Sequence, residues 1–331
     1  MKAMATLVSD RIRILVILCI LIFARSALAK TPVILSTDIG NEIDDQWAIA
    51  YMMASPDLEV LGVMSAHSPS LPDPSGYRSY LLLKDEIENR LGLAVHPPIL
   101  QGGDAALKDK QTAQSNEAVL FLVEQSKRFS RENRLTVLVI GAATDVASAI
   151  LVDPSIVDRI RVVSMAFKDQ ASADEYNVLN DIPAWQVLLG SKVPLVIGPK
   201  DVCRKDLAMY YEQARTLLSK DGVVGAWLWS EWNDWYFRMV KPLRKDDFSK
   251  PRAIWDLITV AYVEGFATTE TKPRPSFGDD FNVTSKSGRG TVEWITHVDS
   301  ERLWSDFQAR LNLHSRTHAI ISDVPPVQAK P

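Results

Sequence analysis

The sequence predicts an α/β fold with an open, mostly parallel (mixed) sheet flanked by helices. Short apolar runs with strand character recur along the chain, and longer segments with helical spacing separate them. Strands that alternate with helices pair mainly in parallel and are covered on both faces. The strand-like runs are residues 32–37, 58–65, 98–101, 135–141, 160–166 and 194–197, and the helical segments include residues 117–129 and 145–151.

The N-terminal segment precedes this pattern and has three zones. Arg11 and Arg13 lie in a basic stretch, residues 14–24 are apolar, and Ala27-Leu28-Ala29 forms an exit of small residues. This order is typical of a secretory signal peptide, and the apolar run is short for a membrane span. We expect a signal peptide over residues 1–29, cleavage after Ala29, and a secreted or periplasmic protein with no stable membrane insertion. An uncleaved N-terminal anchor is the alternative.

Two further segments complete the predicted organisation. Residues 30–321 contain no repeat, low-complexity block or clear linker, so they are interpreted as a single α/β domain. Residues 322–331 include three prolines and are expected to form a disordered tail.

Charge and cysteine content exclude some classes of protein. The formal net charge is −4, and it becomes about −7 once the basic leader is removed. A chain of this charge is not expected to bind nucleic acid through its phosphates. Cys19 lies in the leader, so Cys203 is the single thiol of the mature chain and no internal disulfide can form. Stability must therefore come from a large core.

Three aspartates gather where the first predicted strand meets the first helix. Asp38 ends the strand, while Asp44 and Asp45 open the helix, where the helix dipole favours carboxylates. Helix capping explains one or two of these residues but not all three. Ligands of open α/β sheets bind beyond the carboxyl ends of the strands, and clustered carboxylates favour a hard cation. The acidic turn therefore indicates a cation site.

Four segments of the chain resemble the nucleoside hydrolase family of the inosine-uridine-preferring type. The run DIGNEIDD at residues 38–45 is similar to the N-terminal signature of the family in its longer form. Three later segments agree in order and spacing: VIGAATDVA at residues 139–147, DEYNVLND at residues 174–181, and IWDLITVAY at residues 254–262. A weaker match covers residues 98–103. The resemblance extends from about residue 31 to residue 313 and implies the Rossmann-like nucleoside hydrolase fold.

The resemblance implies a calcium site and a hydrolytic reaction. The ligands it implies are Asp38, Asp45, the main-chain carbonyl of Thr144, and Asp256, an all-oxygen set of the kind that Ca²⁺ prefers. Asp38 would take the proton of a metal-bound water, and this water would attack the anomeric carbon of a ribosyl group. The implied activity is hydrolysis of a nucleoside to ribose and base.

The remaining residues implied by the family pattern would bind substrate. Glu175 and Asn177 would hold sugar hydroxyls, and Asp44 would bind another. Asp169 or Gln170 falls where an asparagine is expected in the family, and Asp169 is taken as the substrate-binding candidate. Without the family pattern, Glu175 would be interpreted as a solvated loop carboxylate.

Two tryptophans mark the part of the sequence that departs from the family. Many members have a histidine acid for the leaving base where this chain has Trp255, and an indole cannot donate a proton at neutral pH. Trp255 could instead stack on a purine, or it could be a core residue. Four tryptophans, Trp232 among them, lie in residues 227–235. They could clamp the base, form a platform for a glycan ring, or pack in the core.

We therefore expect a calcium-dependent N-ribosyl hydrolase that acts on a nucleoside or related ribofuranoside. Two alternatives remain open from the sequence: a non-catalytic, calcium-dependent protein that binds a sugar or nucleoside, and a hydrolase of another glycosidic linkage. The resemblance also implies a homodimer or homotetramer, with a monomer as the alternative.

Overall fold

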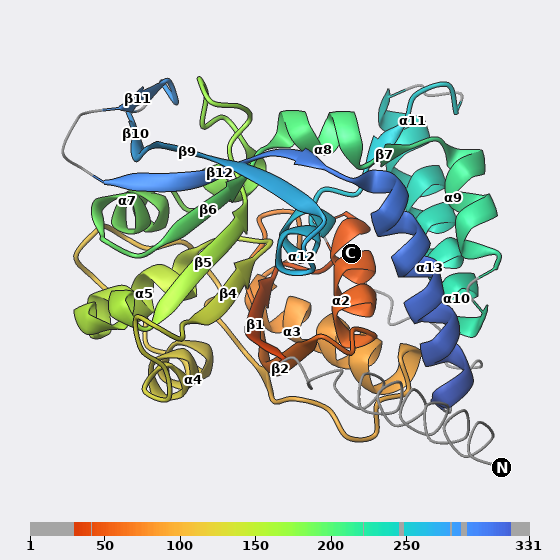
Figure 1. Cartoon of the computed structure of the whole chain (residues 1–331), viewed down its shortest axis with the longest axis horizontal. Coiled ribbons are helices and arrows are strands. Elements are labelled where there is room, and N and C mark those ends of the chain that lie inside the picture. Colours follow the sequence, from red (N-terminus) through yellow and green to blue (C-terminus); the bar gives the residue numbers. More distant parts are fainter. Residues whose placement is uncertain are drawn as a thin grey trace, which may run out of the picture.

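The computed structural model describes residues 30–40, 42–220, 222–244, 248–278, 280–285 and 290–318, with the side chains of residues 243 and 244 left out of the description. A central sheet runs through the molecule, and helices cover both of its faces (Figure 1). The predicted signal peptide and the predicted C-terminal tail lie outside the described residues. Within the described part, no helix is both long enough and apolar enough to cross a membrane.

The central sheet has eight strands in the order β3-β2-β1-β4-β5-β6-β12-β9. Neighbouring strands pair in parallel from β3 to β12, and β9 alone pairs antiparallel, at the edge of the sheet. The prediction of a mostly parallel, mixed sheet flanked by helices is confirmed. In spatial order the strands are β3 (Ile99–Leu100), β2 (Leu58–Ser65), β1 (Thr31–Thr37), β4 (Leu135–Val139), β5 (Ile160–Met165), β6 (Leu195–Gly198), β12 (Thr291–Val298) and β9 (Ala267–Pro273).

The strands bury both faces, which explains their nearly continuous apolar runs. In β1, Val33 and Leu35 belong to one core cluster and Ile34 belongs to the other, as the two-residue period of a strand requires. The first cluster includes residues of α2 (Asp44–Met53), α3 (Ser75–Asp85), α10 (Gly222–Trp235), α12 (Leu257–Val263) and α13 (Ser300–Thr317). The second includes residues of α4 (Glu117–Ser126), α5 (Thr144–Val152) and α7 (Ile182–Gly190).

The order of the strands reverses beside β1. The chain passes from β1 to β2 and β3 on one side, and then returns to β4 on the other side of β1. A reversal of this kind opens a crevice beyond the carboxyl ends of the two central strands. Short elements surround that crevice: α6 (Tyr176–Asn180), α8 (Lys200–Asp206), β7 (Ala208–Met209), α9 (Tyr211–Leu218), α11 (Lys241–Arg244) and β8 (Arg252–Ala253).

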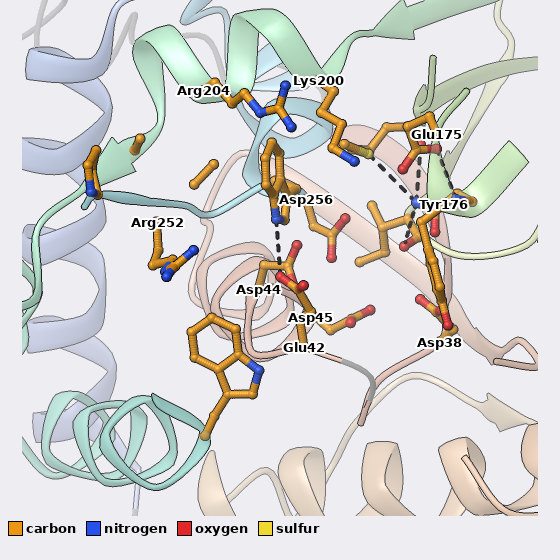
Figure 2. A pocket seen from close by; sticks show the side chains of 18 of the residues that line it. Asp38, Glu42, Asp44, Asp45, Glu175, Tyr176, Lys200, Arg204, Arg252 and Asp256 are labelled. Carbon is orange, nitrogen blue, oxygen red and sulfur yellow. Dashed lines mark hydrogen bonds between the residues drawn. The ribbon is translucent and has the colours of Figure 1, made fainter. Parts of the chain in front are cut away.

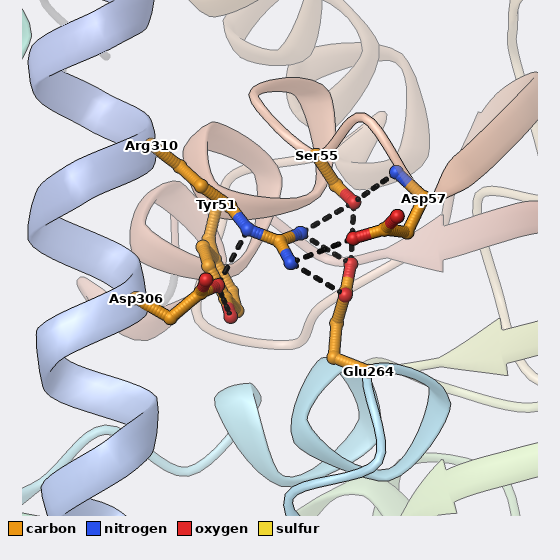
Figure 3. Close-up of polar contacts among 6 residues, drawn as sticks. All are labelled: Tyr51, Ser55, Asp57, Glu264, Asp306 and Arg310. Carbon is orange, nitrogen blue, oxygen red and sulfur yellow. Dashed lines mark hydrogen bonds and ion pairs between the residues drawn. The ribbon is translucent and has the colours of Figure 1, made fainter. Parts of the chain in front are cut away.

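A cluster of polar residues around Arg310 attaches α13 to the rest of the domain (Figure 3). The guanidinium donates to both carboxylate oxygens of Glu264, at 2.7 and 2.9 Å, and to Asp57 at 3.0 Å. Its Nε lies 2.5 Å from Asp306, and Tyr51 donates to the same carboxylate. We call these residues, together with Ser55, the Arg310 cluster. It connects three segments that are far apart in the sequence.

Candidate active site

A cavity of about 610 Å³ opens beyond the carboxyl end of β1 (Figure 2). Its floor consists of carboxylates from the end of β1, from the first two residues of α2 and from the residue before α12. Its walls come from α6, α8, α10 and β8. The cavity therefore occupies the crevice that the strand order creates.

Four buried carboxylates line the floor of this cavity. Asp44, Asp45 and Asp256 each offer an oxygen atom within 4.8 Å of the others. Asp38 faces the same cavity, and its Oδ2 is buried without a hydrogen-bond partner. We call these four residues the acid floor. It brings together residues that are more than two hundred positions apart in the sequence.

Burial and mutual repulsion both act on the acid floor. Burial raises the pKa of each of the four carboxyls well above its usual range. The charge of Asp44 is the next cause for Asp38 and for Asp256, whereas for Asp45 the next cause is the charge of Asp38. Such a group of acids must share protons or bind a cation.

Local backbone features explain the position of Asp38. A Cβ atom at Gly141 would lie only 2.8 Å from the main-chain nitrogen of Asp38 and 2.9 Å from its Oδ1. Only glycine lets the turn after β4 approach the end of β1 so closely. Thr37, the residue before Asp38, donates a hydrogen bond from its hydroxyl to Asp45 and so links the strand end to α2.

Glu175 and Asn177 form the wall of the cavity at α6. The Glu175 carboxylate caps this helix by accepting from the main-chain nitrogen of Asn177 at 2.9 Å. The Asn177 side-chain amide donates to the carbonyls of Met165 at 3.2 Å and Ile140 at 3.3 Å, which fixes it beside two strand ends. Burial raises the pKa of Glu175 to about 7, while the positive charge of Lys200 opposes this shift. These two predicted residues do line the cavity.

Trp255 also lines the cavity, directly before Asp256. The indole is partly buried and donates from Nε1 to Glu42 at 3.2 Å. Lys200 and Arg204 approach its ring, at 5.5 and 5.7 Å from the centroid. Of the two interpretations that the sequence left open, the structure favours an aromatic wall of the site.

Two residues predicted for the site, Trp232 and Asp169, lie elsewhere. Trp232 is fully buried in the core, with its ring centroid 5.4 Å from that of Trp47. The Asp169 carboxylate accepts from two main-chain nitrogens of its own turn, at Ala171 and Ser172, and does not line the cavity. Neither residue lines the cavity: helix α10 turns Trp235 rather than Trp232 toward it, and the Asp169 carboxylate is engaged by its own turn.

Thr144 lies at the start of α5, behind the cavity wall. Its hydroxyl donates to Asp181 at 2.6 Å and lies 2.9 Å from Nε2 of His67. The side chain is therefore engaged away from the acid floor, and Thr144 is absent from the residues that line the cavity. Its carbonyl as a calcium ligand stays a prediction.

Several lining residues were missed by the sequence analysis: Glu42, Tyr176, Lys200, Arg204, Trp235, Lys250 and Arg252. The position of two of these residues after a predicted strand could have identified them from the sequence. Lys200 and Arg204 follow the end of the predicted strand at residues 194–197, at the same edge of the sheet as Asp38.

The fold and the acid floor together define a class: α/β proteins with clustered carboxylates, of the kind that suits a cation, at the carboxyl ends of parallel strands. The sequence model of the inosine-uridine preferring nucleoside hydrolases matches residues 33–305. The chain therefore belongs to the inosine-uridine preferring nucleoside hydrolase family, as its motifs indicated.

Individual relatives are distant. An uncharacterized protein of Schizosaccharomyces pombe is 27% identical over 223 residues, which are 59% of this chain and 70% of the relative. The pyrimidine-specific ribonucleoside hydrolase RihA of Salmonella schwarzengrund is 27% identical over 195 residues, 53% of this chain, and the match spans only 61% of RihA. The purine-preferring ribonucleoside hydrolase of Gardnerella vaginalis shares the fold, with a TM-score of 0.69 at 19% identity over 86% of this chain and 99% of that structure.

Proposed function

We propose that this protein hydrolyses N-ribosidic bonds in a calcium-dependent reaction, with a nucleoside or related ribofuranoside as substrate. The observation that carries this proposal is the acid floor, in which four buried carboxylates face one cavity. Family membership supports the reaction type, and the names of RihA and of the Gardnerella hydrolase agree with a ribonucleoside substrate.

The donor atoms of the acid floor fit calcium. All are oxygens, they lie close together, and Asp38 retains a buried oxygen that has no hydrogen-bond partner. Asp38, Asp45 and Asp256 would hold the ion, with the Thr144 carbonyl as a further ligand. Calcium bound there would position a water molecule and lower its pKa.

The reaction then depends on side chains around the cavity. Asp38 would accept the proton of the attacking water. Asp44, Glu175 and Asn177 would hold the ribose hydroxyls, which orients the anomeric carbon toward the floor. The Trp255 indole would stack on the leaving base, since its ring forms the adjoining wall.

We also propose that the protein is exported from the cytoplasm. The leader composition supports export to a secreted or periplasmic location with cleavage after Ala29. A homodimer or homotetramer remains the proposed assembly.

The test measures release of reducing sugar from uridine and inosine by purified protein. We expect release that stops on chelation and returns on addition of Ca²⁺. The variant Asp38→Asn should lose at least about 1,000-fold in kcat. Asp38 is proposed both as the base that accepts the proton of the attacking water and as a calcium ligand, and the variant weakens both roles. The matched control Asp57→Asn alters an exposed aspartate of the Arg310 cluster and should retain activity. Unchanged hydrolysis by Asp38→Asn would refute the mechanism.

A non-catalytic binding protein is the second candidate function. One observation favours it: no histidine is present among the described residues that line the cavity, so an imidazole acid for the leaving base is missing there. Binding of a nucleoside in the presence of Ca²⁺, with no sugar release over long incubation, would select this alternative.

A further inference from the structure

The cavity has a second charged region that the proposed reaction does not use. This region consists of four basic residues that line the cavity, namely Lys200, Arg204, Lys250 and Arg252. Figure 2 shows Lys200 and Arg204 on the wall formed by α8, across the cavity from the carboxylates of the acid floor. Lys200 and Arg204 therefore lie apart from the acid floor, on the side of the cavity where Lys200 acts on Glu175. We call Lys200 and Arg204 the basic wall.

Lys200 and Arg204 are positioned together by α8. They are four residues apart, so they lie on the same side of the helix, and both approach the ring of Trp255. Within the described residues, neither forms an ion pair with a carboxylate, in contrast to Arg310, which contacts three carboxylates. The tryptophan holds both cations in place while leaving their charges available to a ligand.

The basic wall lies next to the residues proposed to hold ribose. The charge of Lys200 acts on Glu175, and both residues line the cavity. A group attached to a ribose hydroxyl at Glu175 would therefore extend toward Lys200, with Arg204 one turn further along α8. Two cations one helical turn apart can each donate to a different oxygen atom of a phosphoryl group.

We propose that the physiological substrate is a ribosyl compound that carries a phosphoryl group, which Lys200 and Arg204 bind. The inference rests on the proposed function for the orientation of the ribose. It names a phosphorylated substrate where the proposed function allows any nucleoside or ribofuranoside, since an uncharged nucleoside would make no contact that uses the charges of the basic wall.

Binding of two sugars tests the proposal without any turnover. Ribose and ribose 5-phosphate are titrated into the calcium-loaded protein by calorimetry, with inorganic phosphate as a third probe. We expect ribose 5-phosphate to bind at least about 10-fold more tightly than ribose, as two charge-assisted hydrogen bonds would give. Inorganic phosphate should bind more weakly than ribose 5-phosphate. Equal affinities for the two sugars, or equal affinities for inorganic phosphate and ribose 5-phosphate, would overturn the proposal.

Two variants assign the effect to the basic wall. Arg204→Gln changes an exposed side chain, and Lys200→Gln changes a partly buried one. Each should lower the ratio of the two sugar affinities by about 5-fold or more. Lys205→Gln is the matched control, because it removes a charge from the same helix outside the cavity, and it should leave the ratio unchanged. A ratio that is the same in all four proteins would contradict the assignment, and Arg204→Gln keeps the test valid if Lys200→Gln does not fold.

Hydrolysis assays separate this inference from the proposed function. If uridine and uridine 5′-monophosphate both resist hydrolysis while ribose 5-phosphate keeps its advantage, the proposed function fails and the basic wall stands as a phosphoryl-binding site for a ribosyl ligand. If uridine is hydrolysed and ribose 5-phosphate has no advantage, the function stands and the substrate class fails.

Discussion

Helices α2 and α12 each run from the acid floor toward the Arg310 cluster, and the carboxylates of these two clusters have opposite properties. At the N-terminal ends of α2 and α12, Asp44, Asp45 and Asp256 belong to the acid floor. Near the C-terminal ends of these helices, Ser55 and Glu264 belong to the Arg310 cluster. Each carboxylate of the Arg310 cluster contacts a guanidinium, whereas the acid floor consists of acids that repel one another.

This difference separates a structural role from a binding role. The paired charges of the Arg310 cluster neutralise one another and attach α13 to the domain, so this cluster needs no bound ligand. Unpaired buried carboxylates raise the free energy of the empty site, and a cation that binds them recovers that energy. The state of pairing, rather than the presence of acids, identifies the functional cluster.

Removing Arg310 should produce the largest change in stability. Arg310→Met would leave Glu264, whose side chain is only 2% exposed, as a buried charge without its partner. We expect a loss of roughly 3 kcal/mol in the free energy of unfolding, measured by urea denaturation. Arg302→Met is the control, because Arg302 is 68% exposed and its pair with Asp299 should contribute less than about 1 kcal/mol.

Arg310→Met should change the stability of the protein but not its activity. The folded fraction of Arg310→Met should still release sugar from nucleosides, since Arg310 does not line the cavity. A variant of normal stability, or a stable variant without activity, would show that the Arg310 cluster is not the structural counterpart of the acid floor.

A smaller effect of opposite sign is expected at Glu86. This residue lies in the five-residue π-helical turn Glu86–Arg90, where both of its carboxylate oxygens are buried without a hydrogen-bond partner. Burial raises its pKa well above the usual 4.5, and the charge of Asp45 adds to the shift. The folded state therefore binds this proton more tightly than the unfolded state, and stability falls as pH rises above about 4.5.

The variant Glu86→Gln removes that dependence because its side chain cannot ionise. We expect it to be more stable than the wild type by about 1 kcal/mol at pH 8, and the difference should shrink toward zero at pH 4. Urea denaturation at the two pH values measures this. A difference that grows as the pH is lowered would contradict the interpretation of Glu86 as a destabilising buried acid.

The sequence predicted those parts of the fold whose local pattern is strong. Strands β1, β2, β4 and β5 were expected within two residues of their observed ends, because two-sided burial makes each of them a nearly continuous apolar run. Strands β9 and β12 were missed. Strand β9 has the sequence ATTETKP and lies at the sheet edge, where one side of the backbone has no neighbour and polar residues are tolerated.

The residues of the site also differ in how far the sequence could predict them. Asp38, Asp44 and Asp45 are adjacent in the sequence, and a motif could identify them. The basic wall depends on α8 reaching the cavity beside Trp255, a tertiary contact that no local pattern encodes. Trp232 and Trp235 differ by less than one helical turn, so only the orientation of α10 decides which of them enters the core and which lines the cavity.

Calcium titration tests the central claim most directly. Isothermal titration calorimetry on metal-free wild type, Asp256→Asn and Asp57→Asn compares one Asp→Asn change in the acid floor with one in the Arg310 cluster. A calcium site at the acid floor predicts one ion per chain for the wild type and for Asp57→Asn, and an affinity at least about 10-fold weaker for Asp256→Asn, since a charged ligand is lost. Equal calcium affinity in all three proteins, or no binding by the wild type, would contradict it.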